Sequence, residues 1–191
     1  MKKKKVISFT IEEYIQRVLS FHRYEAPGVI IGGFMVHRAR EQMPEGVLFE
    51  AICETSKCLP DAVQLLTPCT TGNGRLRIID SGRFALSLYD KYHGNGFRVF
   101  LDPGKLKDWP EINAWFFKLK PKQEQDQALL LDQIKEAGGT VCGISPIQVN
   151  PRFLKKKKTG NRVICPSCGE AYPAEDGKIC RACQGESPYV L

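Results

Sequence analysis

Apolar residues recur at intervals of three and four along much of the first 135 residues, a pattern typical of helices with one buried face. The first such stretch opens with Thr10 and Glu13, the residues of a capping box. Proline and glycine then divide the remaining helical stretches from one another. Helices are therefore expected over residues 11–19, 27–42, 60–67, 109–119 and 121–135.

Between these helices lie short apolar runs with the composition of β-strands. They are predicted over residues 47–53, 75–80, 83–90, 97–101, 141–144 and 147–149. Ser81-Gly82 and the turn at 93–96 predict that the strands from 75 to 101 form a three-stranded meander. The fold class expected is α+β, with an antiparallel-rich mixed sheet packed by helices, and not a repeating βαβ unit.

The composition changes after residue 150, where a lysine tract and then two Cys-x-x-Cys pairs follow. We predict a core domain over 1–150, a basic linker over 151–162 and a small module over 163–191. The two pairs are Cys165/Cys168 and Cys180/Cys183, the pattern of a four-thiolate structural Zn²⁺ site. A redox pair or an iron–sulfur cluster is the alternative.

The predicted zinc module has too few apolar residues to fold unaided, so Zn²⁺ is expected to stabilise it. From residue 161 onward it carries three basic and four acidic residues. A nucleic-acid reader normally presents a basic face. We therefore expect a protein partner for this module, and nucleic acid only as a minority alternative.

The formal net charge of +7 comes from two tracts, Lys2–Lys5 and Lys155–Lys158. Without them 20 basic residues face 21 acidic ones, and the tracts are interpreted as a solvated tail and a solvated linker. No apolar run approaches the ~20 residues that span a bilayer, and no secretory signal is evident. A cytoplasmic protein is expected, in which eight cysteines indicate metal or thiol chemistry rather than disulfides.

A second group of cysteines lies within residues 50–74. Cys58 is predicted at the N-terminus of a short helix that begins near Pro60, and Cys69 just beyond that helix. A thiol at a helix N-terminus ionises more easily and is a better nucleophile or metal ligand. Reduced cysteines are also common as small core residues, and this alternative stays open.

Several motifs over residues 21–102 resemble the FmdE/FwdE-like family of formylmethanofuran dehydrogenase proteins. They are Phe21-His22, Pro27-Gly28, Glu54-Thr55, Cys58, Asp61-Ala62-Val63-Gln64, Thr67-Pro68-Cys69-Thr70, Gly72 and Asp80-Ser81-Gly82-Arg83. The resemblance implies an α+β core, usually dimeric, with a treble-clef-type zinc finger. It also implies association with molybdenum or tungsten formylmethanofuran dehydrogenase, which handles one-carbon units in methanogenesis.

Family members typically carry His-Gly-His-x-Cys before Pro-Gly, whereas this chain keeps only the first histidine, His22. Tyr24 and Ala26 stand where the family has histidine and cysteine. A cleft with His22, Cys58 and Cys69, joined by Asp61 or Glu25, is the expected second site for a transition metal or a small ligand. Loss of this site, leaving a binding or scaffolding role, is the alternative.

Three functions follow from these observations. The first is a cytoplasmic, homodimeric FmdE-like accessory protein with a ligand-binding cleft at His22, Cys58, Asp61 and Cys69. The second is an enzyme that uses Cys58 or Cys69 as nucleophile and His22 as base. The third is a nucleic-acid binder that depends on the lysine tracts.

Overall fold

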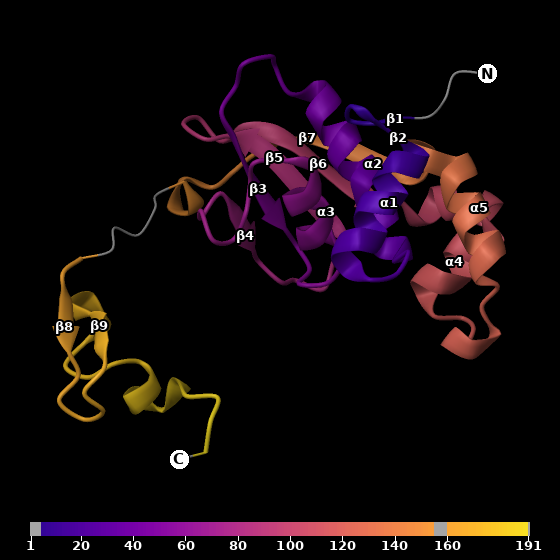
Figure 1. Cartoon of the computed structure of the whole chain (residues 1–191). Coiled ribbons are helices and arrows are strands. Elements are labelled where there is room, and N and C mark those ends of the chain that lie inside the picture. The colour runs from indigo at the N-terminus through magenta and orange to yellow at the C-terminus, as the bar shows by residue number, and fades with distance from the viewer. Residues whose placement is uncertain (1–4, 155–159, 191) are drawn as a thin grey trace. The chain divides into compact units, whose positions relative to one another are not determined.

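The computed structural model describes residues 5–154 and 160–190. The chain forms two compact units, Met1–Leu154 and Lys155–Leu191, drawn in Figure 1. The tract Lys155–Lys158 and residues 2–4 of the first tract lie outside the described residues. The 3-10 turn Pro151–Phe153, within the stretch expected as a linker, belongs to the first unit, where Arg77 donates to the carbonyl of Phe153.

Among the described residues, the core unit contains a five-stranded sheet in the order β4-β3-β5-β6-β7. The strands are β3 (Phe49–Cys53), β4 (Leu76–Ile78), β5 (Ala85–Asp90), β6 (Asn95–Leu101) and β7 (Cys142–Gln148). The β3–β4 pair is parallel, and the other pairs are antiparallel. The predicted α+β class with an antiparallel-rich mixed sheet is confirmed.

The predicted three-stranded meander is wrong in one strand. β4 does not pair with β5; Leu76 lies opposite Ala51 of β3, on the edge of the sheet. The segment from β3 through α3 (Leu59–Leu66) to β4 is a crossover, and a crossover joins parallel strands. β5 then pairs with the other side of β3, so Ser81-Gly82 is part of a connection across β3 and not a hairpin turn.

The helices are α1 (Ile11–His22), α2 (Pro27–Gln42), α3, α4 (Pro110–Phe117) and α5 (Gln127–Ala137). Thr10 and Glu13 form the predicted capping box at the start of α1. Pro27 and Pro60 stand in the first turns of α2 and α3, where a missing N–H costs little. A short antiparallel ribbon, β1 (Lys5–Val6) with β2 (Phe9–Thr10), precedes α1.

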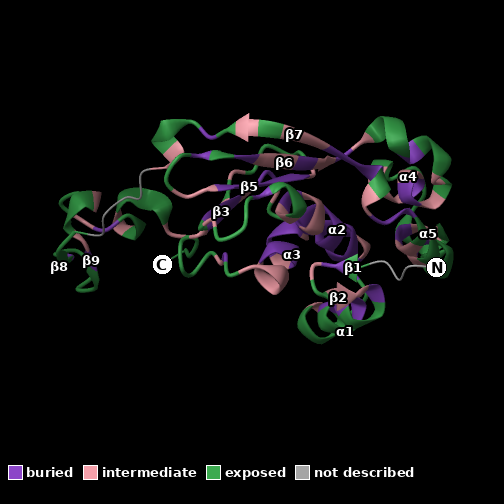
Figure 2. Ribbon diagram, turned by 90° about the horizontal axis from the view of Figure 1, so that it is seen from above, coloured by how far each residue is buried: buried purple, intermediate pink, exposed green. Residues whose placement is uncertain are grey.

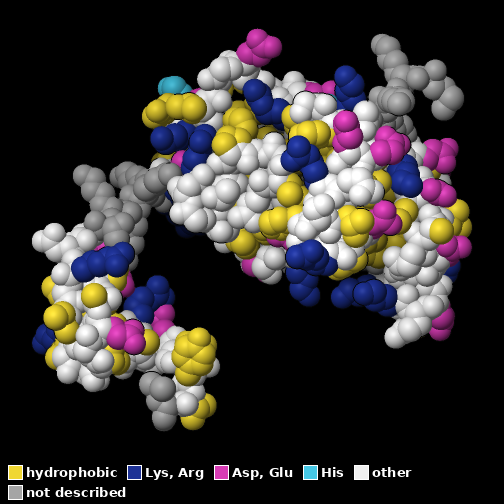
Figure 3. Space-filling view, viewed as in Figure 1, with side chains coloured by type: hydrophobic (Ala, Val, Ile, Leu, Met, Phe, Trp, Pro, Cys, Tyr) yellow, Lys and Arg dark blue, Asp and Glu magenta, His cyan; other side chains and the backbone are white. Residues whose placement is uncertain are grey.

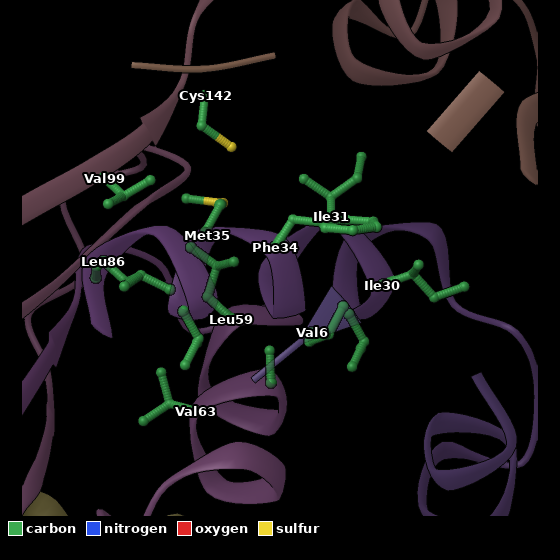
Figure 4. Close-up of a cluster of buried hydrophobic side chains, with 14 of the residues drawn as sticks. Val6, Ile30, Ile31, Phe34, Met35, Leu59, Val63, Leu86, Val99 and Cys142 are labelled. Atoms are coloured by element: carbon green, nitrogen blue, oxygen red, sulfur yellow. The ribbon is translucent and has the colours of Figure 1, made fainter. Parts of the chain in front are cut away.

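α2 is the central helix of the core unit and contacts β5, β6, α1, α3 and α5. Figure 2 shows buried positions along most of α2 and along β3 and β5. Gly33 of α2 touches the ring of Tyr14, because a Cβ at Gly33 would lie 2.2 Å from Cε1 of that ring. Figure 4 shows apolar side chains of α2, α3 and the strands in the cluster around Met35.

The C-terminal unit contains the hairpin β8 (Arg162–Ile164) and β9 (Ala171–Pro173), followed by a helical turn over Ala182–Glu186. Its buried side chains form a cluster of Cys165, Tyr172 and Cys180. This is a very small core, as expected for a unit stabilised by metal. Among the described residues, no helix is both long enough and apolar enough to cross a membrane.

Candidate functional site

The four cysteines of the C-terminal unit converge on one point. Their sulfurs all lie within 4.8 Å of one another, with Cys165 3.9 Å from Cys183 and Cys168 3.7 Å from Cys180. A tetrahedron with Zn–S bonds of about 2.3 Å has S–S edges of about 3.8 Å. The spacing therefore fits a Zn²⁺ ion held by Cys165, Cys168, Cys180 and Cys183.

Local backbone geometry brings each Cys-x-x-Cys pair into position. The first pair lies in the turn between β8 and β9, where Gly169 adopts φ +78° and donates its N–H to the carbonyl of Cys165. The second pair begins the turn of the final helical segment, and the N–H of Cys180 donates to Sγ of Cys165. This hydrogen bond, together with those from the backbone N–H groups of Cys168 and Ser167, lowers the pKa of the Cys165 thiol to about 6, which favours the thiolate that binds metal.

In the core unit, His22 and Asp61 meet across two helices. Nδ1 of His22, in the last turn of α1, lies 3.0 Å from Oδ2 of Asp61 in the first turn of α3. About a quarter of each side chain is exposed. The pair is therefore a polar contact that a ligand from solvent can reach.

Cys58 lies immediately before α3, as the sequence predicted, and has φ +61°. An L-residue at positive φ is uncommon and is often found at functional sites. The thiol is half-buried against Gly28 of α2, since a Cβ at Gly28 would lie 2.7 Å from Sγ of Cys58. Burial, followed by the charge of Asp61, raises the pKa of Cys58. The local environment therefore favours the neutral thiol of Cys58 over the activated thiolate that was expected at this helix N-terminus.

The structure separates Cys69 from this group. Cys69 is fully buried, and its thiol donates to the carbonyl of Phe49 at 3.5 Å. Across the described ranges, the four C-terminal cysteines are the only His, Cys, Asp and Glu group of three or more with ligand atoms this close together. The expected gathering of His22, Cys58 and Cys69 into one ligand set is therefore not present, because Cys69 packs in the core beyond α3. Glu25 is exposed and does not join such a group either.

A pocket of about 550 Å³ lies in the core unit, and neither His22 nor Asp61 lines it. Tyr24 and Trp115 line it, and the ring of Tyr24 also packs on that of His22 with centroids 4.7 Å apart. Three lysines, Lys118, Lys120 and Lys122, lie along the same pocket. Sequence reasoning missed these lysines; the alternation of lysine with aromatic and proline residues over 115–122 was the only signal that marked them.

Glu54, from the Glu54-Thr55 motif, lies between two arginines at the end of β3. Arg98 donates to it at 2.6 and 3.0 Å, and Arg83 of the Asp80–Arg83 motif lies 2.7 Å away. Burial raises the pKa of Glu54, but the two arginines outweigh burial and hold that pKa below its usual range. The two motifs therefore join through this ion triad, which fixes the loop after β4 to the sheet.

Basic side chains do not gather into one patch on the face of the core unit that Figure 3 shows. On the face of the core unit drawn in Figure 3, Lys and Arg side chains are interspersed with acidic and apolar ones. Nucleic-acid binders usually cluster their basic residues. This observation gives the third function no support on that face.

The fold and the metal geometry define a class of protein with an α+β core unit followed by a four-cysteine zinc finger. The chain matches the model described as FmdE, molybdenum formylmethanofuran dehydrogenase operon, over residues 21–148. Residues 156–190 match the FmdE treble clef zinc finger. The chain belongs to the FmdE family, as the sequence motifs predicted.

A solved structure from Syntrophus aciditrophicus, a tungsten formylmethanofuran dehydrogenase FmdE-like protein, is 52% identical to this chain. The match covers 100% of both chains with a TM-score of 0.92. A curated protein of Archaeoglobus fulgidus, a probable S-adenosyl-L-methionine-binding protein, is 28% identical over 192 residues, covering 88% of this chain. The chain spans about half of that relative's length, 52%.

Proposed function

We propose that this chain is a cytoplasmic accessory protein of formylmethanofuran dehydrogenase-type one-carbon metabolism. Its core unit binds a small aromatic anion in the Tyr24–Trp115 pocket, and its zinc finger contacts a protein partner. The observation that carries the ligand proposal is the contact between the Tyr24 ring and His22, which joins an aromatic, lysine-lined pocket to a solvent-accessible histidine–aspartate pair.

The walls of the pocket set the class of ligand. Tyr24 is half exposed, and Trp115 forms edge contacts with Phe84, so both offer apolar surface to an aromatic ring. Lys120 is paired with Glu111, whereas neither Lys118 nor Lys122 has an ion pair within the described residues. Two positive charges therefore remain for carboxylate or phosphate groups of the ligand.

A small ligand fits the core site better than a metal. Cys69 is withdrawn into the core, and Tyr24 and Ala26 supply no soft ligand in place of the family histidine and cysteine. The enzyme alternative also lacks the contact it needs, because no hydrogen bond links the Cys58 thiol to His22 in the described chain. The raised pKa of Cys58 weighs against a nucleophilic thiolate as well.

Binding of methanofuran and adenosine monophosphate to the full zinc-loaded chain tests the ligand class. S-adenosylmethionine, which carries a net positive charge, is the contrasting probe, and preferential binding of it would refute an anionic ligand. We expect Tyr24→Leu and Lys122→Met to weaken binding of the preferred probe about tenfold or more. Tyr92→Leu is the matched control, because Tyr92 is also exposed and also has a lysine, Lys91, over its ring. Equal loss in Tyr92→Leu, or no binding of any probe, would refute the proposal.

Zinc analysis separates the ligand proposal from a second metal site. We expect one zinc per chain in the wild type, complete loss in Cys165→Ser and no loss in Cys58→Ser. A second zinc that disappears with Cys58→Ser would establish a metal centre in the core unit and overturn the small-ligand proposal.

The zinc finger carries exposed apolar side chains that support a protein partner. Val163 and Ile164 of β8 are 41% and 73% exposed, and Tyr189 is 76% exposed. Surface apolar residues grouped on a small unit are typical of interaction sites. We expect Ile164→Asp to abolish co-elution with purified formylmethanofuran dehydrogenase, whereas Arg162→Asp on the same strand leaves it in place. Sedimentation of the free chain tests the proposed homodimer.

A further inference from the structure

We infer that a second pocket in the core unit, on the side of Arg38 and Lys105, binds a small oxyanion. The pocket has a volume of about 430 Å³, within the usual range for small-molecule sites. Its walls come from distant parts of the chain: Lys5 of β1, the C-terminal half of α2, Lys105, and the segment 137–142. It shares no lining residue with the Tyr24–Trp115 pocket, so this inference does not rest on the proposed function.

The pocket carries an excess of positive charge. Lys5, Arg38 and Lys105 line it, against one carboxylate, Glu41. A concave surface with charge of one sign concentrates ions of the other sign. The electrostatics therefore favour an anion with more than one negative charge.

Arg38 has hydrogen-bond donors that the described chain does not use. Its Nε is buried and has no partner among the described residues, and Nη1 lies 3.9 Å from Oε2 of Glu41, beyond hydrogen-bond distance. A guanidinium has five N–H donors, and buried donors are nearly always bonded. Its planar fork matches the oxygens of a phosphate or carboxylate group.

Neighbouring groups hold the pocket in shape. The stem of Arg38 lies on the backbone at Gly139, where a Cβ would come within 3.0 Å of Cγ and Cδ. Nζ of Lys105 donates to the carbonyl of Cys142 at 2.7 Å, which ties the 3-10 helix Pro103–Asp108 to β7. The N–H of Ile7 donates to Nδ1 of His37 at 3.0 Å, so Nε2 is the N–H donor of that ring, and it lies 3.5 Å from Oε1 of Glu41.

The remaining wall does not oppose an anion. Burial raises the pKa of Cys142 to about 12, despite the nearby charges of Arg38 and Lys105, so its thiol stays neutral. The hydroxyl of Thr140 donates to the carbonyl of Ala137, so it has no proton left for an anion, and binding rests on the cationic side chains. The ligand class that fits is a small metabolite bearing a phosphate or two carboxylates.

Calorimetric titration of the full zinc-loaded chain tests this inference. Inorganic phosphate and succinate are the two probes, because they distinguish a phosphate from a dicarboxylate, and chloride at equal ionic strength is the reference. We expect Arg38→Met to weaken binding of the preferred probe about tenfold or more, and Arg38→Lys to weaken it less. Lys107→Met is the matched control, because it removes one exposed charge two residues from Lys105.

The inference is supported if either probe binds saturably, if Arg38→Met weakens that binding, and if Lys107→Met changes it less than about twofold. Binding no tighter than that of chloride, or an equal loss in Arg38→Met and Lys107→Met, overturns it, because the attraction would then be general. If Arg38→Met does not fold, Lys5→Met replaces it in the comparison with Lys107→Met. Lys5 is exposed, so its replacement is not expected to disturb the fold.

Discussion

Replacing Gly28 with alanine tests the packing that shapes the Cys58 site. Gly28 is the second residue of α2, and its Cα faces the thiol across the start of α3. An added methyl would lie 2.7 Å from Sγ and 2.9 Å from Cβ of Cys58. Ordinary van der Waals contact begins near 3.4 Å, so the two helices must move apart or the thiol must turn away.

The size of the effect follows from two opposing contributions. Overpacking in a well-packed core costs about 1–3 kcal/mol. Replacing glycine by alanine in a helix returns roughly 0.5–1 kcal/mol, less in the first turn. We therefore expect Gly28→Ala to lower the free energy of unfolding by about 1–2 kcal/mol. Each kcal/mol lost should lower Tm by about 2–4 °C.

Tryptophan fluorescence during urea unfolding measures the core unit alone, because both tryptophans, Trp109 and Trp115, lie in it. The matched background is Cys58→Gly, which removes both contacted atoms and also suits the positive φ at this position. In that background Gly28→Ala should cost less than about 0.5 kcal/mol.

An equal cost in both backgrounds would refute the argument, since it would show that the methyl group meets something other than Cys58. A neutral Gly28→Ala in the wild-type background would also refute it, because the helices would then be free to adjust without loss.

Three further predictions concern the zinc finger, the ion triad and the core thiols. Chelation of zinc, or Cys165→Ser, should unfold the C-terminal unit and leave the fluorescence Tm of the core unit unchanged. A fall in the Tm of the core unit would show that the stabilities of the two units are coupled. Glu54→Gln should cost about 1–3 kcal/mol at neutral pH, because Arg98 loses its charged partner. Since the pKa of Glu54 is lowered in the folded state, this contribution is complete above the unfolded-state pKa of about 4.3. It disappears as pH falls through the lower folded-state pKa, so denaturation curves of both proteins should converge in acid. Iodoacetamide should label Cys58 of the folded chain before the buried Cys69, as measured by mass spectrometry. The pH midpoint of the labelling rate at Cys58 should lie above the free-thiol pKa of about 8.5, because the pKa of Cys58 is raised. A lower midpoint would restore the hypothesis of a thiolate nucleophile.

Local signals in the sequence predicted most helix starts because those starts are determined locally. The helix expected from residue 121 is the exception, since Lys122–Glu124 forms a separate 3-10 turn and α5 begins at Gln127. Thr10 with Glu13, and the prolines at 27 and 60, act through their own backbone geometry within one turn. Strand order depends on distant partners, and for that reason β4 was placed wrongly. Pro146 also divided one predicted strand into two, whereas β7 continues through it, since an edge strand tolerates a residue without an N–H.

The candidate sites show the same division. The zinc ligands were predicted because two short turns carry all four, so spacing alone determines their geometry. The pairing of His22 with Asp61 and the withdrawal of Cys69 depend on how α1, α3 and β3 pack together, which no spacing encodes. The Arg38 pocket went unnoticed because its three cations come from separate segments spread over about a hundred residues.

The core unit and the zinc finger keep separate hydrophobic clusters, and only the smaller one contains cysteines of the four that fit Zn²⁺. Scarcity of zinc would therefore act on part of this molecule and spare the rest. A cell short of the metal would then hold copies with a folded core unit and an unfolded tail, in which the proposed ligand pocket would remain and the proposed partner contact would be lost.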